Sequence, residues 1–316
     1  MTRISRRRLL KATGAAAAVP ALAALATARA QPQAPDIGDL RAERDIVFGR
    51  AGDMDMTLDV YRPPEGVESK RMAIIHVFGG GFFVGNKGAG YIINDSKALG
   101  ARGYTNISAN YRLQSEGPWP AQIHDTKAAI RWTRAHADEL GIDADKIAIA
   151  GYSAGGMLSL LAGATNGQAE FEGDVGTPGV SSEVQAAIGV YPLATAANSA
   201  GLFPDMSDAE RETAMAAASP ISHIGPNHAP TIFIHGTADT TVPMQSSIDY
   251  FNRLQENDVE SALTLIQGAA HAFDNAALDA VDLMAQSIDL FLDRLFVDPQ
   301  PYPAFGAGGG GRGGPG

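Results

Sequence analysis

The 316-residue sequence contains no cysteine. This absence excludes a disulfide scaffold and a catalytic thiol, and it suits a chain that folds before export. The sequence also lacks an H-E-x-x-H motif and any cluster of residues with metal-ligand spacing, so we predict neither a metal site nor a cofactor. We find no internal repeat, which favours a globular domain over a repeat array.

Acidic residues are missing from the first thirty positions, which hold six of the 24 basic residues. The segment Ser5-Arg6-Arg7-Arg8-Leu9-Leu10-Lys11 resembles the twin-arginine export motif, and an Ala-rich stretch and the small-residue site Ala28-Arg29-Ala30 follow it. A transmembrane helix is less favoured because the stretch is short and is broken by Pro20. We therefore expect residues 1–30 to be a signal peptide and the mature protein to be periplasmic or secreted.

Removal of residues 1–30 leaves 286 residues, with 18 basic and 35 acidic side chains and a formal net charge of −17. This length is sufficient for one α/β domain with a large core. The negative charge argues against nucleic acid or an anionic membrane as a partner of the mature chain. The expected partner is a small-molecule or carbohydrate ester, and no pattern in the sequence indicates an oligomeric state.

Strand and helix patterns alternate along most of the chain. Residues 31–42 resemble a Pro-rich linker, and residues 43–48 and 55–61 are predicted to form an antiparallel strand pair. Strands near 72–77, 104–109, 146–150, 185–191, 230–235 and 262–267 then alternate with helices, which predicts a mostly parallel sheet covered on both faces. Apolar stripes mark the helix after Pro120, as far as Leu140, and the last helix, from Ala277 to Leu295. We place the folded domain at 43–297 and a disordered Gly/Pro-rich tail at 298–316.

The pentapeptide Gly151-Tyr152-Ser153-Ala154-Gly155 lies between the apolar run 146–150 and the helix-compatible run 156–162. Strand, G-x-S-x-G and helix form a nucleophile elbow, a tight turn that exposes the serine hydroxyl at the end of a sheet. The pentapeptide alone would also fit a Gly-rich turn around a solvated serine, but the flanking elements favour the elbow. Ser153 is therefore the predicted nucleophile.

The elbow requires a base and an orienting acid further along the chain. His271 follows the predicted strand 262–267, and Asp239 follows the predicted strand 230–235. We predict that Asp239 holds the imidazole of His271, which deprotonates Ser153. The alternatives are a loop histidine without a role and an aspartate that caps a helix, and Asp258 and Glu260 fit the acid role less well.

Three glycines follow the predicted strand 72–77, in the segment Phe78-Gly79-Gly80-Gly81-Phe82. Consecutive glycines let backbone N–H groups approach a ligand closely, so we predict Gly80, Gly81 and Ala154 as the oxyanion hole. A dinucleotide-binding loop is disfavoured because the segment continues with bulky residues and does not match the G-x-G-x-x-G spacing.

With these motifs in order, the chain resembles serine α/β-hydrolases of the BD-FAE type and of the hormone-sensitive-lipase-like carboxylesterases. The resemblance implies an α/β-hydrolase fold, serine esterase activity through an acyl-enzyme and a catalytic triad of Ser153, Asp239 and His271. One position departs from the family, which usually has a histidine before the glycines to brace the loop, whereas this chain has Phe78. The segments that carry the resemblance are 57–63, 79–82, 110–113, the elbow, 235–243 and 270–273.

The region 192–222 is predicted to be a short cap, with a helix that begins near Ser207. Its acidic residues and its lack of a broad apolar face favour small or carbohydrate-linked acyl esters over long-chain lipids. A non-catalytic binding module on the same fold and a peptidase-like serine hydrolase are the alternatives. The predicted substrate-binding residues are Phe82, Trp119, Tyr152 and Phe273, with Phe83, Tyr191 and Phe203 as further aromatic candidates.

Overall fold

The computed structural model describes residues 40–197, 199, 202–203 and 206–300. The predicted signal peptide at 1–30, residues 31–39 of the predicted linker and residues 301–316 of the predicted tail lie outside the described residues. The acidic cap residue Asp205 also lies outside them.

Within the described residues, eight strands form one sheet in the order β1-β2-β4-β3-β5-β6-β7-β8. The strands β1, β2 and β4 pair antiparallel, and β4, β3, β5, β6, β7 and β8 pair parallel. The predicted fold class, a mostly parallel sheet with an antiparallel strand pair at its start, is confirmed. The strands are β1 Arg41–Ala51, β2 Met54–Arg62, β3 Ala73–Val77, β4 Thr105–Ala109, β5 Ile147–Tyr152, β6 Ala186–Val190, β7 Thr231–Gly236 and β8 Ser261–Ile266.

The central strands are buried along their whole length, whereas β1 at one edge is largely exposed. This difference explains why the central strands are continuous apolar runs in the sequence. The strand β1 begins at Arg41, so the predicted linker 31–42 is wrong at its end. Residues 41 and 42 already belong to the sheet, where they pair with Arg62 and Tyr61 of β2.

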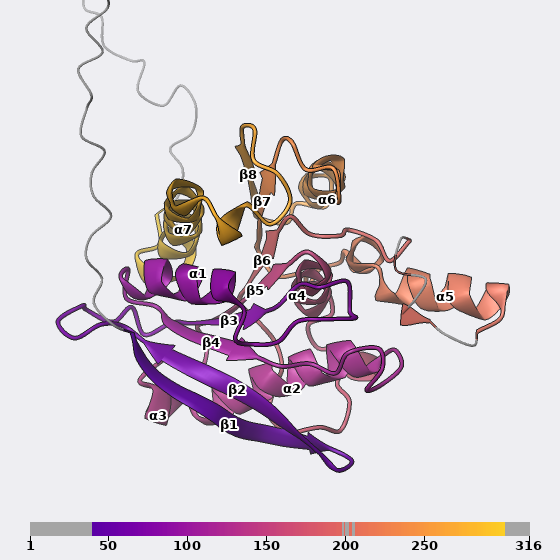
Figure 1. Cartoon of the computed structure of the whole chain (residues 1–316), viewed down its shortest axis with the longest axis horizontal. Coiled ribbons are helices and arrows are strands. Elements are labelled where there is room, and N and C mark those ends of the chain that lie inside the picture. Colours follow the sequence, from indigo (N-terminus) through magenta and orange to yellow (C-terminus); the bar gives the residue numbers. More distant parts are fainter. Residues whose placement is uncertain (1–39, 198, 200–201, 204–205, 301–316) are drawn as a thin grey trace, which may run out of the picture. The chain divides into compact units, whose positions relative to one another are not determined.

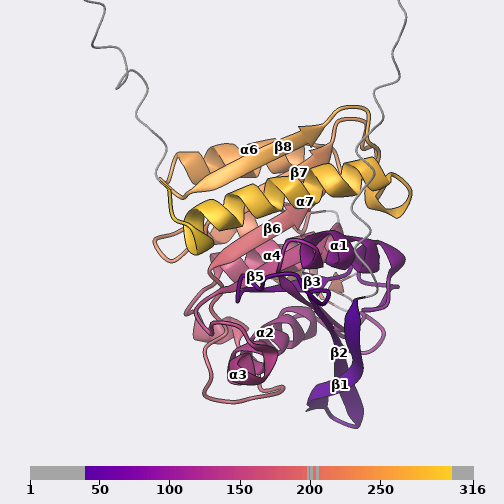
Figure 2. The ribbon, with the colours of Figure 1, turned by 90° about the vertical axis from the view of Figure 1, so that its left-hand side faces the viewer.

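Helices cover both faces of the sheet (Figure 1). The helices α1 (Gly90–Gly100) and α7 (Leu278–Leu292) pack side by side on one face, where Figure 2 shows them in front of the strands. The helices α2 (Ala121–Ala135), α4 (Ala154–Ala164) and α6 (Gln245–Gln255) lie on the other face. Every residue of α4 is buried, because this helix lies against the central strands β5 and β6.

Two helix predictions need correction. The predicted helix through Leu140 is interrupted at His136, so that α2 ends at Ala135 and a separate turn, α3, spans Ala137–Leu140. The predicted stripe of the last helix is buried from Val281 to Phe291, but α7 ends at Leu292. A π-helical turn, η5 (Asp293–Val297), follows it and contains Leu295.

The cap contains α5 (Asp208–Ala218) and the short 3-10 helix η3 (Pro220–His223). Ser207 caps α5, because its hydroxyl accepts a hydrogen bond from the Glu210 N–H while the Glu210 side chain accepts one from the Ser207 backbone. The predicted helix start is therefore confirmed. Two further 3-10 helices, η1 (Ala169–Phe171) and η4 (Phe273–Asn275), lie in loops. None of the helices in the described part of the chain is long and apolar enough to cross a membrane.

The carboxyl ends of five neighbouring parallel strands lie at one edge of the sheet, in the order β3, β5, β6, β7 and β8. The glycine loop follows β3, Ser153 follows β5, and Tyr191 follows β6. Asp239 and His271 lie in the loops after β7 and β8. Ligand sites of open α/β sheets form at such an edge.

Candidate active site

Three predicted residues form one continuous hydrogen-bond chain. His271 Nε2 lies 3.0 Å from Ser153 Oγ, and His271 Nδ1 lies 2.7 Å from Asp239 Oδ2. Because the carboxylate oxygen can only accept, Nδ1 carries the proton and Nε2 is left to accept the serine hydroxyl. This is the arrangement in which an imidazole can remove a proton from a serine.

The elbow forces Ser153 into a backbone conformation that non-glycine residues rarely adopt, with φ of 53° and ψ of −115°. The glycines on both sides make the turn possible. A Cβ on Gly151 would lie 2.0 Å from Gly155 O, and a Cβ on Gly155 would lie 2.2 Å from Val77 O and 2.3 Å from Phe78 O. The turn therefore packs backbone against backbone, at the point where the glycine loop leaves β3.

Asp239 has a fully buried carboxylate, and N–H groups surround it. Its Oδ1 accepts from Thr241 N and Val242 N, each at 2.9 Å. Its Oδ2 accepts from His271 and lies 3.3 Å from Nε2 of His235, a buried residue of β7. Hydrogen bonds from several donors compensate for the loss of water around a buried carboxylate.

The glycine loop approaches the elbow directly, since a Cβ on Gly79 would lie 3.1 Å from Ser153 Cβ. Gly79 N donates to the hydroxyl of Tyr91, 2.9 Å away. Among the described residues, Gly80 N, Gly81 N and Ala154 N donate no hydrogen bond. These three N–H groups are the ones predicted as oxyanion donors.

Phe78, in the position where the family usually has histidine, is part of an aromatic brace. Its ring stacks on Tyr111 at a centroid distance of 4.2 Å, and the Tyr111 hydroxyl donates to the Phe78 carbonyl at 3.1 Å. At the far end of the loop, Lys87 forms an ion pair with the buried Asp59. The loop is thus held at both ends without the histidine.

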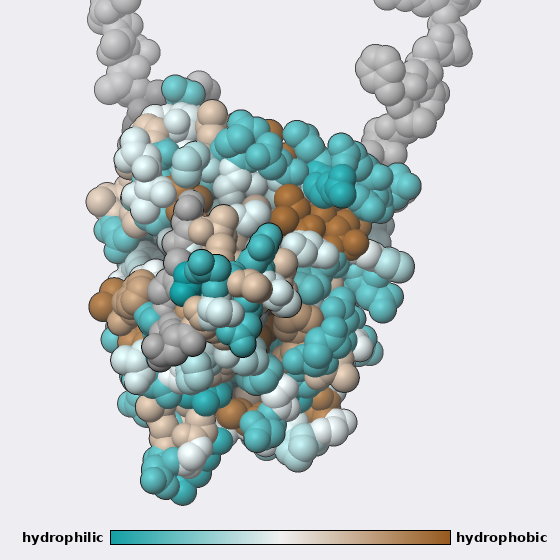
Figure 3. Space-filling model, turned by 90° about the vertical axis from the view of Figure 1, so that its right-hand side faces the viewer, coloured by the Kyte–Doolittle hydropathy of each residue, from teal (hydrophilic) through white to brown (hydrophobic). Residues whose placement is uncertain are grey.

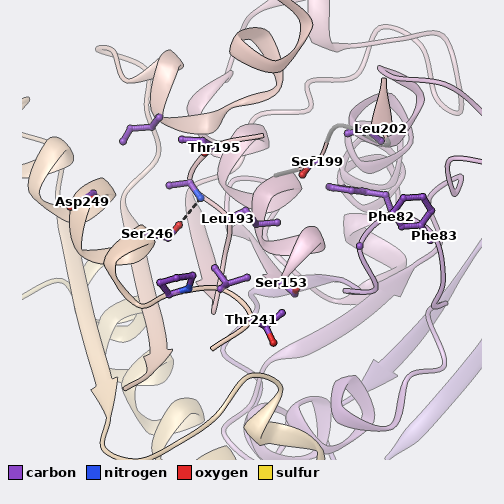
Figure 4. A pocket seen from close by; sticks show the side chains of 15 residues that line it. Phe82, Phe83, Ser153, Leu193, Thr195, Ser199, Leu202, Thr241, Ser246 and Asp249 are labelled. Carbon is purple, nitrogen blue, oxygen red and sulfur yellow. Dashed lines mark hydrogen bonds between the residues drawn. The ribbon is translucent and has the colours of Figure 1, made fainter. Parts of the chain in front are cut away.

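Beside Ser153 is a pocket of about 460 Å³. Figure 4 shows Ser246 and Asp249 of α6 on one side, Phe82 and Phe83 on the other, and Ser153 between them. The lining residues are Gly81, Phe82, Phe83, Ser153, Leu193, Ala194, Thr195, Ser199, Leu202, Ile221, Thr241, Val242, Pro243, Ser246 and Asp249.

Of the predicted substrate-binding residues, Phe82 lines this pocket and the other three do not. Tyr152 is buried, and its hydroxyl lies 2.9 Å from His76 Nδ1 of β3. Phe273 is buried against Tyr191, and Trp119 packs edge-on against Phe203. Phe83 is the exposed aromatic residue of the lining, with 58% of its surface accessible.

Behind His271 lies a buried polar network that sequence reasoning missed. The Tyr191 ring contacts the His271 ring at a centroid distance of 4.7 Å, and its hydroxyl donates to Asp274, 2.7 Å from each carboxylate oxygen. Burial raises the pKa of Asp274 to about 6. Burial and the charge of Asp274 also raise the pKa of Asp95. Only the position of Asp274, three residues after His271, could have drawn attention to it.

The sheet and the turn at Ser153 together define the class of this chain as a protein of the α/β-hydrolase fold with a nucleophile elbow. Residues 58–254 match the BD-FAE family. The chain belongs to this family, which confirms the resemblance inferred from the motifs.

Several proteins that this chain resembles are esterases. The chain is 29% identical over 273 residues to the esterase LipC of Mycobacterium tuberculosis, a match that covers 80% of this chain and 65% of LipC. It therefore spans less than two thirds of the length of that relative. The structure of the thermophilic esterase Est2 from Thermogutta terrifontis with bound propionate superposes with a TM-score of 0.69 at 31% identity, covering 82% of this chain and 97% of Est2. A truncated carbohydrate esterase from gut microbiota superposes with a TM-score of 0.65 at 26% identity, covering 78% of this chain and 96% of that esterase.

The packing at the elbow leads to a prediction about Gly155→Ala. The added methyl group would meet two backbone carbonyls that cannot move without displacing β3. We expect the free energy of unfolding to fall by on the order of 3 kcal/mol, measured by urea denaturation. Gly90→Ala, at the start of α1 with no atom within 4 Å of the new Cβ, is the matched control. It should stay within about 0.5 kcal/mol of wild type. Equal stability of the two variants would contradict the packing argument.

Proposed function

We propose that this protein is a serine carboxylic-ester hydrolase that acts on small or carbohydrate-linked acyl esters. The observation that carries the proposal is the hydrogen-bond chain from Asp239 through His271 to Ser153, which opens on a pocket beside the glycine loop. The esterase relatives support the reaction class. A non-catalytic binding module would have no use for a serine held at φ 53° against an imidazole.

In the proposed reaction, Ser153 Oγ attacks the ester carbonyl while its proton passes to His271 Nε2. Asp239 stabilises the imidazolium that forms and keeps the ring in the productive tautomer. The imidazolium then protonates the leaving alkoxide, and the acyl group remains on Ser153. Water attacks this acyl-enzyme with His271 as base, which releases the acid and restores the hydroxyl.

The negative oxygen of each tetrahedral intermediate would accept from the N–H groups of Gly80, Gly81 and Ala154. Two facts support this assignment: the described residues leave these groups without an acceptor, and the Gly79 backbone contacts Ser153. Donors fixed before the reaction stabilise the developing charge without reorganisation. Tyr91 and Tyr111, which bond to Gly79 N and Phe78 O, position the loop that carries two of them.

The composition of the pocket supports a short acyl group and a polar alcohol. One part of the lining is apolar, with Leu193, Leu202 and Val242, and another carries the hydroxyls of Thr195, Ser199 and Thr241. Most of the face on the α5 side is hydrophilic or only weakly hydrophobic, with strongly hydrophobic surface in a few separate patches (Figure 3). Such a surface lacks the broad apolar area that an interfacial lipase presents to lipid.

Export of the protein is a further part of the proposal, and it rests on Arg6, Arg7 and Arg8 ahead of the Ala-rich stretch. Export would bring the enzyme to a substrate outside the cytoplasm, since acylated polysaccharides do not cross a bilayer.

The nucleophile can be tested with a fluorophosphonate probe, which reacts with activated serines. Ser153→Ala should lose the label, and its kcat should fall by about 10⁴-fold or more while it stays above the rate in water. Ser246→Ala is the matched control, because the Ser246 hydroxyl lines the same pocket but bonds to Pro192 O and Ala194 N. Ser246→Ala should keep the label. Labelling of Ser153→Ala would refute the assignment.

Acyl length separates a small-ester hydrolase from a lipase. Methylene groups that remain in water gain none of the roughly 0.8 kcal/mol that each buried CH₂ contributes. We expect kcat/KM for p-nitrophenyl esters to be highest from acetate to butyrate. At octanoate it should be lower by a factor of roughly ten or more. Activity on acetylated xylan, measured as released acetate, tests the alcohol side separately. Faster turnover of octanoate than of acetate would exclude the small-ester proposal.

Export predicts a mature N-terminus near Gln31, which sequencing of the periplasmic protein would identify. Replacing Arg6 and Arg7 by lysine should leave the uncleaved chain in the cytoplasm, whereas Arg3→Lys, outside the motif, should not. Wild-type protein found in the cytoplasm with residues 1–30 intact would show that the segment is not an export signal.

A further inference from the structure

A second buried histidine lies next to the acid of the site. His235 is the fifth residue of β7 and has no accessible surface. Its Nε2 lies 3.3 Å from Asp239 Oδ2. The mechanism proposed above does not use it. Burial lowers the pKa of His235, so the ring is neutral at the pH where the enzyme would work.

The partners of His235 determine which of its nitrogens carries the proton. Nε2 lies 2.8 Å from Val242 O, and a carbonyl oxygen can only accept, so Nε2 carries the hydrogen. Nδ1 lies 2.8 Å from Ser247 Oγ and must therefore accept the Ser247 hydroxyl. Ser247, in α6, is itself fully buried. The neutral ring is thus locked in one tautomer from both sides.

This tautomer directs a fixed N–H dipole toward the site in two ways. First, the Nε2–H group of His235 donates to the carbonyl of Val242, and the backbone N–H of Val242 donates to Asp239 Oδ1 at 2.9 Å. It also brings a partial positive charge close to Asp239 Oδ2, the oxygen that accepts from His271. In a buried site, such a charge–dipole contact is weakly screened.

We propose that His235 is a positioning residue of the active site: its Nε2–H, selected by Ser247, fixes Asp239 and limits the negative potential that Asp239 exerts on His271. The proposal rests on the proposed function in so far as Asp239 and His271 act in catalysis. The effect of His235 on the electrostatic environment of His271 can be measured without ester hydrolysis.

The sign of the effect follows from the charges. Removal of the Nε2–H leaves Asp239 Oδ2 more negative, so the imidazolium form of His271 becomes more stable and its proton is lost only at higher pH. The free base is the form that can deprotonate Ser153. The acid limb of the pH profile should therefore move to higher pH.

Other groups also face His271, and they remain the same in every variant. Asp274 of η4 acts on it through charge, the Tyr191 ring after β6 contacts it, and Asp239 follows β7. Because these groups are retained, a difference between a variant and wild type reports on His235 alone.

The test uses His235→Leu, which has similar volume and no donor, and His235→Gln, whose side-chain amide can place an N–H near the position of Nε2. For His235→Leu we expect the acid limb of kcat/KM with p-nitrophenyl acetate to rise by about half a unit to one unit of pH. Its kcat should fall roughly tenfold with little change in KM. His235→Gln should recover most of both, and Ser247→Ala should shift the limb in the same direction by less.

His228→Leu is the matched control for lost stability. His228 is also buried, with Nε2 2.9 Å from Tyr250 Oη and Nδ1 2.8 Å from Ala229 O, but it precedes β7 and, in the described part of the chain, forms no hydrogen bond with a triad residue. It should lower the melting temperature without moving the acid limb. If the limb of His235→Leu coincides with that of wild type, or if His235→Gln shifts it as far as His235→Leu, the positioning role is wrong.

A proton NMR titration of the His271 ring, assigned by its loss in His271→Ala, separates this proposal from the proposed function. It measures the His271 pKa without any substrate, and we expect the His235→Leu value to exceed that of wild type. A raised pKa in a protein that hydrolyses no ester would support the positioning role and refute the activity. An unchanged His271 pKa in an active esterase would support the activity and refute the positioning role. If His235→Leu does not fold, Ser247→Ala provides the same measurement.

Discussion

The contact between the elbow and the end of β3 is the constraint on which the site depends. Gly155 lies so close to the carbonyls of Val77 and Phe78 that no side chain fits, and a Cβ on Gly79 would lie 2.8 Å from Tyr152 O. Because the two turns touch through their backbones, the position of Ser153 and the path of the glycine loop are set together. The strained φ of Ser153 is tolerated because β5, β3 and the fully buried helix α4 over-determine it.

The remaining parts of the site are fixed by the order of strands at the sheet edge. The strands β5, β6, β7 and β8 are neighbours, so Ser153, Tyr191, Asp239 and His271 lie in successive loops of one edge. The side chains that surround His271 have hydrogen-bond partners within the protein: Asp239 accepts backbone and imidazole N–H groups, and Tyr191 donates to Asp274. Water is therefore not needed to hold the imidazole, and the pocket beside Ser153 is left for a ligand.

The sequence alone predicts much of this arrangement, for identifiable reasons. Strand order along the chain and turn chemistry are local signals, which is why the elbow and the strands were predicted within a few residues. Side-chain packing across the sheet is not local. Tyr152 is the last residue of an apolar strand and could have pointed either way, and only its contact with His76 shows that it faces inward. The two tyrosines that hold the glycine loop are likewise distant in sequence: Tyr91 accepts from Gly79 N, and Tyr111 donates to Phe78 O, so their positions depend on how α1 and the end of β4 pack.

The turn that begins at Gly80 has a consequence for how such an enzyme can change. The N–H groups of Phe83 and Val84 both donate to Gly80 O, at 3.1 and 3.2 Å, and the Phe83 ring lines the pocket. One short turn thus carries both a surface that meets the substrate and the peptide planes proposed to hold the oxyanion. Substitutions that remodel this wall also tilt those planes, so selectivity and rate change together there. The opposite wall, from α6 and the cap, lies far along the chain from the glycines, and it is the side on which substrate range can diversify at little cost to turnover.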